Sequence, residues 1–467
     1  MDDVTLQRAA LERANEGDEL GPEASPLRSR RRFLRRTAGA GAAVALASLV
    51  DGWAGVIETA NAVAGDRSPT ELAGDESFWF QVQQAYDIDR SLINLNNGGV
   101  APSPRVVHSA MVRQLGITNH VPPRQLWLLQ DPQIELVRTR LAKAFGCDRE
   151  ELAITRNASE SLQICLNGID LEPGDEILTT TQDYPRMLNT IKQRVQRERV
   201  VMKQVTLPVP VEADDDVVRL FESAITPKTR VILFCHIVNI TGEILPVKRI
   251  CAMARERGIR TIVDGAHAFA HFVYSGRDLG CDYYGTSLHK WLSAPIGTGF
   301  LYVRRERIGD LWPLTAPDDP RSDNIRKFEE IGTHPSAPRM AIAEALAFFE
   351  GIGPDRKEKR LRYLRNYWAD RLLKHDRIHI HTNLAPEHSC GIAVVEIEGI
   401  DSIDLSGHLW EKHKILVTPI MHEDFQGIRV TPNTYTTLGE LDLFVEAMED
   451  VIAHGVGRKR EVEKKKA

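Results

Sequence analysis

The sequence predicts an α/β fold in which a mostly parallel sheet of the seven-stranded type, wrapped by helices, forms a large domain. A smaller α/β domain follows it. Three observations carry this prediction. From residue 92 onward, short apolar runs alternate with segments of helical periodicity, as in a parallel sheet covered by helices. Polar or glycine-bearing residues follow several of these runs directly, and the 467 residues are enough for two domains and an appendage.

Five short apolar runs are predicted to be buried strands of the large sheet. In order, they cover residues 152–155, 176–181, 231–235, 261–264 and 297–303. The first four lead into the loops Asn157–Ser159, Asp183–Tyr184, Asn239–Gly242 and Gly265–His267. In open α/β sheets, ligands bind outside the carboxyl ends of the strands. We therefore expect these four loops to meet at one crevice.

The carboxyl-terminal part is predicted to be a smaller α/β domain. A helical pattern runs between residues 338 and 374, and alternation of apolar and polar residues returns at 377–381 and 391–397. His379 and His381 resemble a metal-binding pair, but no third ligand is suggested nearby. One face of an edge strand explains these two histidines better, so no metal site is predicted.

We expect five segments along the chain. Residues 1–64 form a signal and leader, 65–95 an arm that joins the small domain, and 96–350 the large domain. Residues 351–457 form the small domain. The charge run over 458–467 is typical of a solvated tail.

Composition argues against several classes of protein. A formal net charge of −6 gives no reason to expect a nucleic-acid partner. The six cysteines lack Cys-x-x-Cys spacing, so neither a zinc site nor a disulfide framework is predicted, and most are expected to be buried thiols. No phosphate-loop motif and no well-placed dinucleotide-binding glycine motif follows a predicted strand, which argues against a nucleotide-binding protein.

A lysine and an aspartate in separate segments give the main indication of chemistry. Asp264 ends an apolar run and begins Asp264-Gly-Ala-His267, and Lys290 ends Ser287-Leu-His-Lys290. Pyridoxal 5'-phosphate needs a lysine to form an imine with its aldehyde and a carboxylate to keep its ring nitrogen protonated. Alone, the aspartate would be a helix cap and the lysine a surface residue. Together they predict a site for this cofactor.

Further residues suit the rest of such a cofactor. Asn157-Ala-Ser-Glu160 precedes an apolar helix pattern, and free N–H groups at a helix start bind phosphate. A capping box of Asn157 and Glu160 is the alternative, and both can hold. Ser287 and His289 could add phosphate contacts, His267 could bond the ring oxygen or be a core histidine, and Tyr184 could stack on the ring.

Arg429, in Gly427-Ile-Arg-Val-Thr431 of the small domain, could reach the same crevice. A guanidinium group suits bidentate binding of a substrate carboxylate. A structural ion pair is an equally good interpretation of this arginine from the sequence alone.

In this order, four segments resemble the class V aminotransferase family of fold type I pyridoxal-phosphate enzymes, in its isopenicillin N epimerase-like branch. They are Asn94–Gly99, Thr155–Glu160, Asp264–His267 and Ser287–Leu292, the last leading into Gly297-Thr-Gly299. The resemblance covers residues 92 to 453. It implies a homodimer with active sites at the subunit interface.

The resemblance also implies a role for each matching residue. Lys290 would be the imine lysine, Asp264 the partner of the ring nitrogen, and His267 a contact of the ring hydroxyl oxygen. Tyr184 would stack on the ring. Ala158, Ser159, Ser287 and His289 match phosphate-binding positions, Thr333 matches a phosphate contact donated by the neighbouring subunit, and Asn239 and Arg429 match positions that hold the substrate's α-carboxylate.

The resemblance leaves the reaction open. Breaking a bond at Cα of an amino acid or peptide leads to epimerisation or transamination, depending on where the proton returns, or to β-elimination if a group leaves from Cβ. Periplasmic enzymes that tailor siderophore peptides give a rival substrate class, and a catalytically silent scaffold is the least favoured interpretation. Cysteine desulfurases of the family carry a cysteine shortly before the carboxylate arginine. Residues 417–427 have none and Cys390 lies too early, which argues against desulfurase activity.

The amino terminus carries the pattern of a twin-arginine export signal, Ser29-Arg-Arg-Arg-Phe-Leu-Arg35. An Ala/Gly-rich stretch over 37–50 follows and is too short to span a bilayer. Ala60-Asn61-Ala62 or Ala62-Val63-Ala64 offers a cleavage site. The twin-arginine machinery carries folded proteins, so we expect a periplasmic protein that acquires its cofactor first. A disordered basic leader or an uncleaved anchor is the alternative, and the protein is cytoplasmic if the signal does not function.

Overall fold

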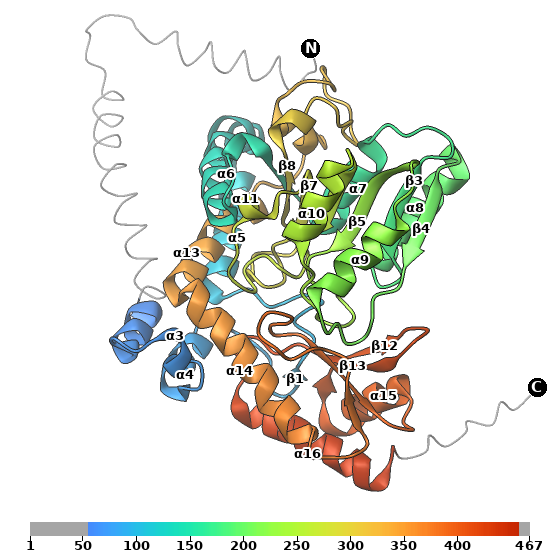
Figure 1. Ribbon diagram of the computed structural model, residues 1–467. Helices are drawn as coiled ribbons and strands as arrows, with labels where there is room; N and C mark the ends of the chain where they lie inside the picture. Colours follow the sequence, from blue (N-terminus) through green and yellow to red (C-terminus); the bar gives the residue numbers. More distant parts are fainter. Residues whose placement is uncertain (1–54, 457–467) are drawn as a thin grey trace, which may run out of the picture.

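The computed structural model describes residues 55–456, and its largest element is a seven-stranded sheet (Figure 1). Strand β8 runs antiparallel to both of its neighbours, whereas the other strands run parallel to one another. In spatial order the strands are β2 (Leu152–Thr155), β8 (Gly299–Val303), β7 (Tyr283–Ser287), β6 (Arg260–Asp264), β5 (Thr229–Cys235), β3 (Glu176–Thr180) and β4 (Val201–Val205). The predicted fold class, a mostly parallel sheet with a smaller carboxyl-terminal part, is confirmed.

All five strands predicted for this sheet are present, and two more were missed for different reasons. The edge strand β4 reads Val-Met-Lys-Gln-Val and has no buried residue, so it lacks the apolar run of a central strand. Strand β7 reads Tyr-Tyr-Gly-Thr-Ser and is buried throughout. Its small residues lie against helix α7 (Ala158–Gly168), which an apolar pattern does not reveal.

Alternate side chains of the central strands enter two different cores. In β5, Ile232 and Phe234 join one core and Val231 and Leu233 join the other. This alternation follows from the pleat of a strand and shows that helices cover both faces. The first face is covered by α5 (Arg105–His120), α6 (Asp131–Phe145), α9 (Asp214–Ala224), α10 (Val247–Glu256) and α13 (Ile342–Ile352), and the second by α7 (Ala158–Gly168) and α8 (Pro185–Glu198).

Short helical turns complete this part of the molecule. They are the π-helical η1 (Arg124–Gln130), the 3₁₀ turns η2 (Arg149–Glu151), η3 (Arg305–Arg307) and η4 (Ile325–Glu329), and the α-helices α11 (Gly276–Leu279) and α12 (Ala337–Met340). Helix α12 contacts both α5 and α6. The turn η4 instead contacts the edge strand β2.

The carboxyl-terminal part holds a four-stranded antiparallel sheet with its own core. Strand β9 lies at its edge, as predicted for the segment with His379, and the His379 side chain is exposed. His381 bonds Glu396 Oε2 at 2.6 Å. The strands are β12 (Thr418–Met421), β13 (Gln426–Val430), β10 (Ala393–Ile397) and β9 (Ile378–Ile380), and the helices are α14 (Pro354–Leu372), α15 (Ser402–His413) and α16 (Leu438–His454).

A short parallel pair ties the beginning of the chain to this carboxyl-terminal part. Strand β1 (Ile93–Asn94) pairs with β11 (Ile415–Leu416), and Asn96 forms an isolated bridge with Thr431. The pairing places the segment that begins at Asn94 beside β13. Residues far apart in the sequence are thereby brought to one place.

Residues 55–64 are helical and pack with α3 (Pro69–Leu72) and α4 (Glu76–Gln83) in one apolar cluster. Ala60 and Ala64 are buried there, so both predicted cleavage triplets lie in a packed helix. The twin-arginine motif lies outside the described residues, as does the predicted tail over 458–467. Within residues 55–456, no helix combines the length and the apolar character needed to cross a membrane.

Candidate active site

Lys290, His267 and Asp264 come together at the carboxyl ends of two neighbouring strands. Strand β6 ends at Asp264 and β7 ends at Ser287, and Asp264 pairs in register with Gly285. The loops that follow therefore leave the sheet side by side. Lys290 Nζ lies 3.0 Å from His267 Nε2. The predicted lysine thus lies at the carboxyl ends of these strands, beside the predicted histidine.

Gly265 allows the loop after Asp264 to turn closely over β7. A Cβ atom at this position would lie 1.9 Å from the Tyr284 ring. Only glycine fits such an approach without moving the aromatic side chain. The glycine thus lets Asp264 and His267 face the same side of the sheet as Lys290.

Burial raises the pKa of the Asp264 carboxyl group to about 6, and a hydrogen bond from Ala266 N together with the charge of Lys290 opposes that rise. The carboxylate is 4% exposed. A buried carboxylate without a full positive partner is costly, and a protonated ring nitrogen would supply one. Asp264 therefore fits the position opposite a cationic pyridine nitrogen.

Burial lowers the pKa of Lys290 to about 8; Asp264 opposes this shift and the positive charge of Arg429 reinforces it. The following residues Trp291 and Leu292 are buried, as predicted from the apolar surroundings. An amine attacks a carbonyl group only when it is neutral. Lys290 is therefore prepared for covalent attachment of an aldehyde.

His267 is neutral because burial and the charge of Lys290 place its pKa well below its ordinary value. Its Nδ1 atom is buried and has no hydrogen-bond partner among residues 55–456. His271, which the sequence analysis did not single out, fixes the loop: its Nδ1 donates to the His267 carbonyl at 2.7 Å and its Nε2 accepts from Gly391 N at 2.8 Å. The His271 ring also stacks on Trp291 with centroids 3.6 Å apart.

The start of helix α7 forms a polar cradle next to this group. Ala158 N donates to Ser287 Oγ at 2.9 Å, which joins two predicted phosphate contacts. Ser159 follows in the first turn. His289 is half-buried, and its Nδ1 atom has no partner among the described residues. Backbone N–H groups at a helix start favour an anion such as phosphate.

The predicted capping of α7 is present only in part. The Asn157 side chain accepts from Glu160 N at 2.8 Å, as a cap does. Glu160 does not return to Asn157, because its carboxylate bonds the backbone N–H and the guanidinium group of Arg156. The cap therefore occupies Glu160 N, while Ala158 N is bonded to the Ser287 hydroxyl.

Arg429 approaches the crevice from β13 and contacts loops of both parts of the molecule. It donates to the Asn239 carbonyl at 2.8 Å and to Asn96 Oδ1 at 3.1 Å, and burial lowers its pKa to about 10. Its Nε atom and Asn239 Oδ1 are buried without partners among the described residues. Arg429 has no salt bridge with any residue of 55–456, so the alternative of a structural ion pair is not supported.

Tyr184 and Thr333, two other predicted site residues, lie in different surroundings from each other. Tyr184 is half-buried at the start of α8, and its hydroxyl accepts from Arg186 Nε at 3.1 Å. Thr333 is exposed and lines a separate charged cavity of about 770 Å³ together with Arg138 and Arg326. Apart from Thr333, none of the predicted site residues lines that cavity.

Asn96 and Thr418 are further polar residues at the site that the sequence analysis did not assign. Asn96 Oδ1 accepts from Thr418 Oγ1 at 2.6 Å as well as from Arg429. The signal for Asn96 is its place within the polar run Asn94–Gly99. Thr418 follows β11 with no local signal, because its position depends on strand pairing in the carboxyl-terminal sheet.

The residues present fit pyridoxal 5'-phosphate. A lysine with a depressed pKa faces a buried carboxylate, and a helix start with a serine hydroxyl lies beside them. The orphaned ring nitrogens of His267 and His289 show that the pocket offers polar atoms that the protein itself does not satisfy. Such a site can bind an aldehyde covalently, hold a cationic ring and move a proton at a carbon atom bonded to it.

Comparison with known proteins supports this interpretation. Residues 93–419 match the family model described as aminotransferase class-V. Isopenicillin N epimerase from Amycolatopsis lactamdurans is 30% identical over 395 residues, which cover 80% of this chain and 98% of the relative.

Two solved structures show the same fold at lower identity. The cysteine desulfurase CsdA from Escherichia coli superposes with a TM-score of 0.70 and 21% identity, covering 80% of this chain and 98% of that chain. A C-DES variant with glycine covalently linked to its PLP cofactor gives a TM-score of 0.69 and 21% identity, covering 77% and 97%.

Proposed function

The chain belongs to the class V aminotransferase family of pyridoxal-phosphate enzymes, and we propose that it acts at Cα of an amino acid or an amino-acid-containing peptide, as an epimerase or aminotransferase. The observation that carries this proposal is the position of Lys290 Nζ, 3.0 Å from His267 Nε2 and close enough to Asp264 for the two charges to shift each other's pKa. This is the arrangement that binds the cofactor and then removes a proton.

The residues of the site have separate tasks in such a reaction. The bound cofactor withdraws electrons from Cα of the substrate. Asp264 maintains the positive charge on the ring nitrogen, and the start of α7 with Ser287 holds the phosphate. About half of the Lys290 amine is neutral at pH 8, near its pKa, and in that form it could accept a proton from Cα of a substrate held by the cofactor.

Arg429 supplies the contact for the substrate's α-carboxylate, together with Asn239. The guanidinium group is buried and carries no carboxylate partner from residues 55–456, so an incoming carboxylate would complete its hydrogen bonding. A charge-assisted pair of this kind fixes the orientation of the substrate. The Cα–H bond would thereby be held toward Lys290.

The cysteines favour this proposal over desulfuration. Cys390 is fully buried, and burial raises the pKa of its thiol to about 12. No cysteine occurs between Val417 and Gly427, the stretch that contains β12 and the turn leading into β13. A nucleophilic thiolate needs exposure and a depressed pKa. β-Elimination needs no protein thiol and stays as the alternative reaction.

The proposal is tested by exchange of the Cα hydrogen in D₂O. Purified holoenzyme is incubated with a panel of amino acids and short peptides, and deuterium at Cα is measured by mass spectrometry. Chiral chromatography then distinguishes epimers from 2-oxo acid products. We expect exchange with the wild type and none with Lys290→Ala. Equal exchange by Lys290→Ala would refute the assignment of the base.

We further propose a homodimer. Leu136 on α6 and Ile296 after the lysine loop are 69% and 74% exposed, so both side chains are free to pack against a second subunit. Thr333 is exposed near these elements and is free to reach a second subunit. Sedimentation equilibrium should give twice the chain mass, and a monomer at micromolar concentration would contradict the proposal.

Export by the twin-arginine machinery is proposed from the amino-terminal motif. Because Ala60 and Ala64 are packed in the fold, we expect processing, where it occurs, to leave the helix over 55–64 in the mature protein. Replacement of Arg30 and Arg31 by lysine should retain the protein in the cytoplasm, as measured by cell fractionation. Mass spectrometry of the exported protein locates its first residue.

A further inference from the structure

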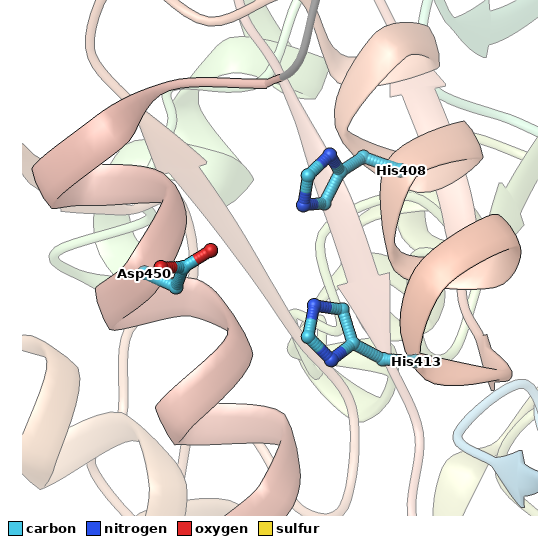
Figure 2. Close-up of side chains that lie close together, drawn as sticks. All are labelled: His408, His413 and Asp450. Carbon is cyan, nitrogen blue, oxygen red and sulfur yellow. The ribbon is translucent and has the colours of Figure 1, made fainter.

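A second cluster of metal-binding side-chain types lies in the carboxyl-terminal part, outside the site described above. His408 and His413 come from α15, and Asp450 comes from α16. One ligand atom from each of these side chains lies within 4.8 Å of the other two. Figure 2 shows both imidazole rings and the carboxylate turned toward the same space between the two helices.

The inner member of the cluster has an unsatisfied nitrogen. The His408 side chain is only 9% exposed, and its Nε2 atom is buried without a hydrogen-bond partner among residues 55–456. Buried polar atoms are normally paired, because water is no longer available to them. An orphaned imidazole nitrogen that faces a second histidine and a carboxylate therefore points to a missing ligand.

We propose that His408, His413 and Asp450 bind a divalent transition-metal ion of the zinc type. Two imidazole nitrogens and one carboxylate oxygen suit Zn²⁺ and its first-row neighbours rather than Mg²⁺ or Ca²⁺, which prefer oxygen ligands. Three protein ligands leave one position of a tetrahedral ion for water or another ligand.

The separation of the ligand atoms is compatible with closure around an ion. Tetrahedral zinc with bonds of about 2.0–2.1 Å holds its ligand atoms roughly 3.3 Å apart. The ligand atoms lie within 4.8 Å of one another, and rotation of exposed side chains can bring them closer, since both His413 and Asp450 are exposed. The buried His408 stays in place and acts as the fixed ligand.

His454 lies one helical turn after Asp450 on α16 and orients its carboxylate. The His454 Nδ1 atom is 3.0 Å from Asp450 Oδ1. Groups that bond to a ligand without touching the metal commonly fix its orientation and change the metal affinity about 10- to 100-fold when removed. His454 is exposed and can also swing in as a fourth ligand.

The test uses full-length holoenzyme stripped of metal by a chelator, with Zn²⁺ alone as the titrant in calorimetry. We expect one zinc ion per chain and at least tenfold weaker binding in His413→Gln and in Asp450→Asn. Both side chains are exposed, so both variants should fold. The visible absorption of bound Co²⁺ provides a second readout of nitrogen and oxygen ligation.

Two controls separate this site from the alternatives. His375→Gln removes an equivalent histidine–carboxylate pair, His375 with Glu449 at 3.3 Å, and should leave the affinity unchanged. His422→Ala removes a second cluster of His422, Glu423 and Asp424 in the turn after β12. Loss of zinc only in His422→Ala, undiminished binding in His413→Gln and Asp450→Asn, or no binding at millimolar zinc would each overturn the proposal.

Discussion

In the seven-stranded sheet, the functional side chains follow the ends of parallel strands, whereas in the four-stranded sheet Arg429 lies within an antiparallel strand. Asp264 and Ser287 are the last residues of β6 and β7, and Lys290 follows three residues later. Arg429 is the fourth residue of β13, paired with Val394 and Thr418. The parallel direction of the strands is enough to bring Asp264, Ser287 and Lys290 to one end of the sheet. The position of Arg429 depends instead on the register of strand pairing.

The two regions also differ in whether their charged groups have partners of opposite charge. The large sheet gathers groups of opposite charge, Lys290 and Asp264, and each raises the population of the other's charged form. The carboxyl-terminal sheet presents Arg429 with backbone, amide and hydroxyl partners but no carboxylate, so its charge is uncompensated by residues 55–456. This difference teaches that the first region is prepared for chemistry and the second for binding.

The largest effect is expected for Asp264→Asn, which removes the carboxylate from the site at the large sheet and should lower kcat. Loss of a charge that stabilises the reacting system typically lowers kcat by about 10²- to 10³-fold, and we expect KM to change little. Steady-state kinetics with the substrate found by Cα exchange measures both constants.

Asp282 provides a matched control for this prediction, because it lies at the amino end of β7, away from the candidate site. Asp282 is also buried, precedes β7 and accepts from Thr261 N at 2.9 Å. Asp282→Asn should lower thermal stability while leaving kcat unchanged. A similar loss of kcat in both variants would mean that buried carboxylates act on the fold rather than on the reaction.

Arg429→Ala should have a smaller and different effect. A hydrogen bond to a charged group contributes about 1.5–3 kcal/mol, so we expect KM to rise roughly 10- to 100-fold with an almost unchanged spectrum of bound cofactor. The control Arg377→Ala removes a guanidinium group that bonds the backbone carbonyls of Ile452 and Glu398 in the same part of the fold. Unchanged KM in Arg429→Ala would show that the carboxylate binds elsewhere.

The sequence located the large-sheet half of the site because its residues obey a local rule. Apolar runs mark β3, β5 and β6, and polar residues placed directly after such runs must face the carboxyl edge of the sheet. Lys290 could be found in spite of the missed β7, since its own segment and the apolar residues after it were distinctive.

In the other half, the residue type of Arg429 left a substrate contact and an ion pair equally open, and its partners Asn96 and Thr418 were not predicted, because no local pattern encodes them. Asn96 and Thr418 contact Arg429 across 333 and 11 residues of sequence, through strand pairings that periodicity does not define. His408 and His413 were overlooked for a similar reason. Their partner Asp450 lies on another helix, so the cluster exists only after α15 and α16 have packed.

The smallest expected effect is on the pH dependence of cofactor uptake. This effect tests whether Lys290 and Asp264 interact. With the pKa of Lys290 at about 8, roughly a tenth of the amine is neutral at pH 7 and about half at pH 8. The rate of uptake by cofactor-free protein, followed by absorbance, should therefore rise almost tenfold per pH unit below 8 and level off above it.

Asp264→Asn should move this midpoint to lower pH. The Asp264 carboxylate favours the ammonium form of Lys290, and a neutral amide removes that interaction, so the amine loses its proton more easily. The variant would then take up cofactor faster than the wild type near pH 7 while still turning over more slowly. A midpoint near the ordinary lysine value in both proteins would mean that Lys290 is solvated and that the two groups do not interact.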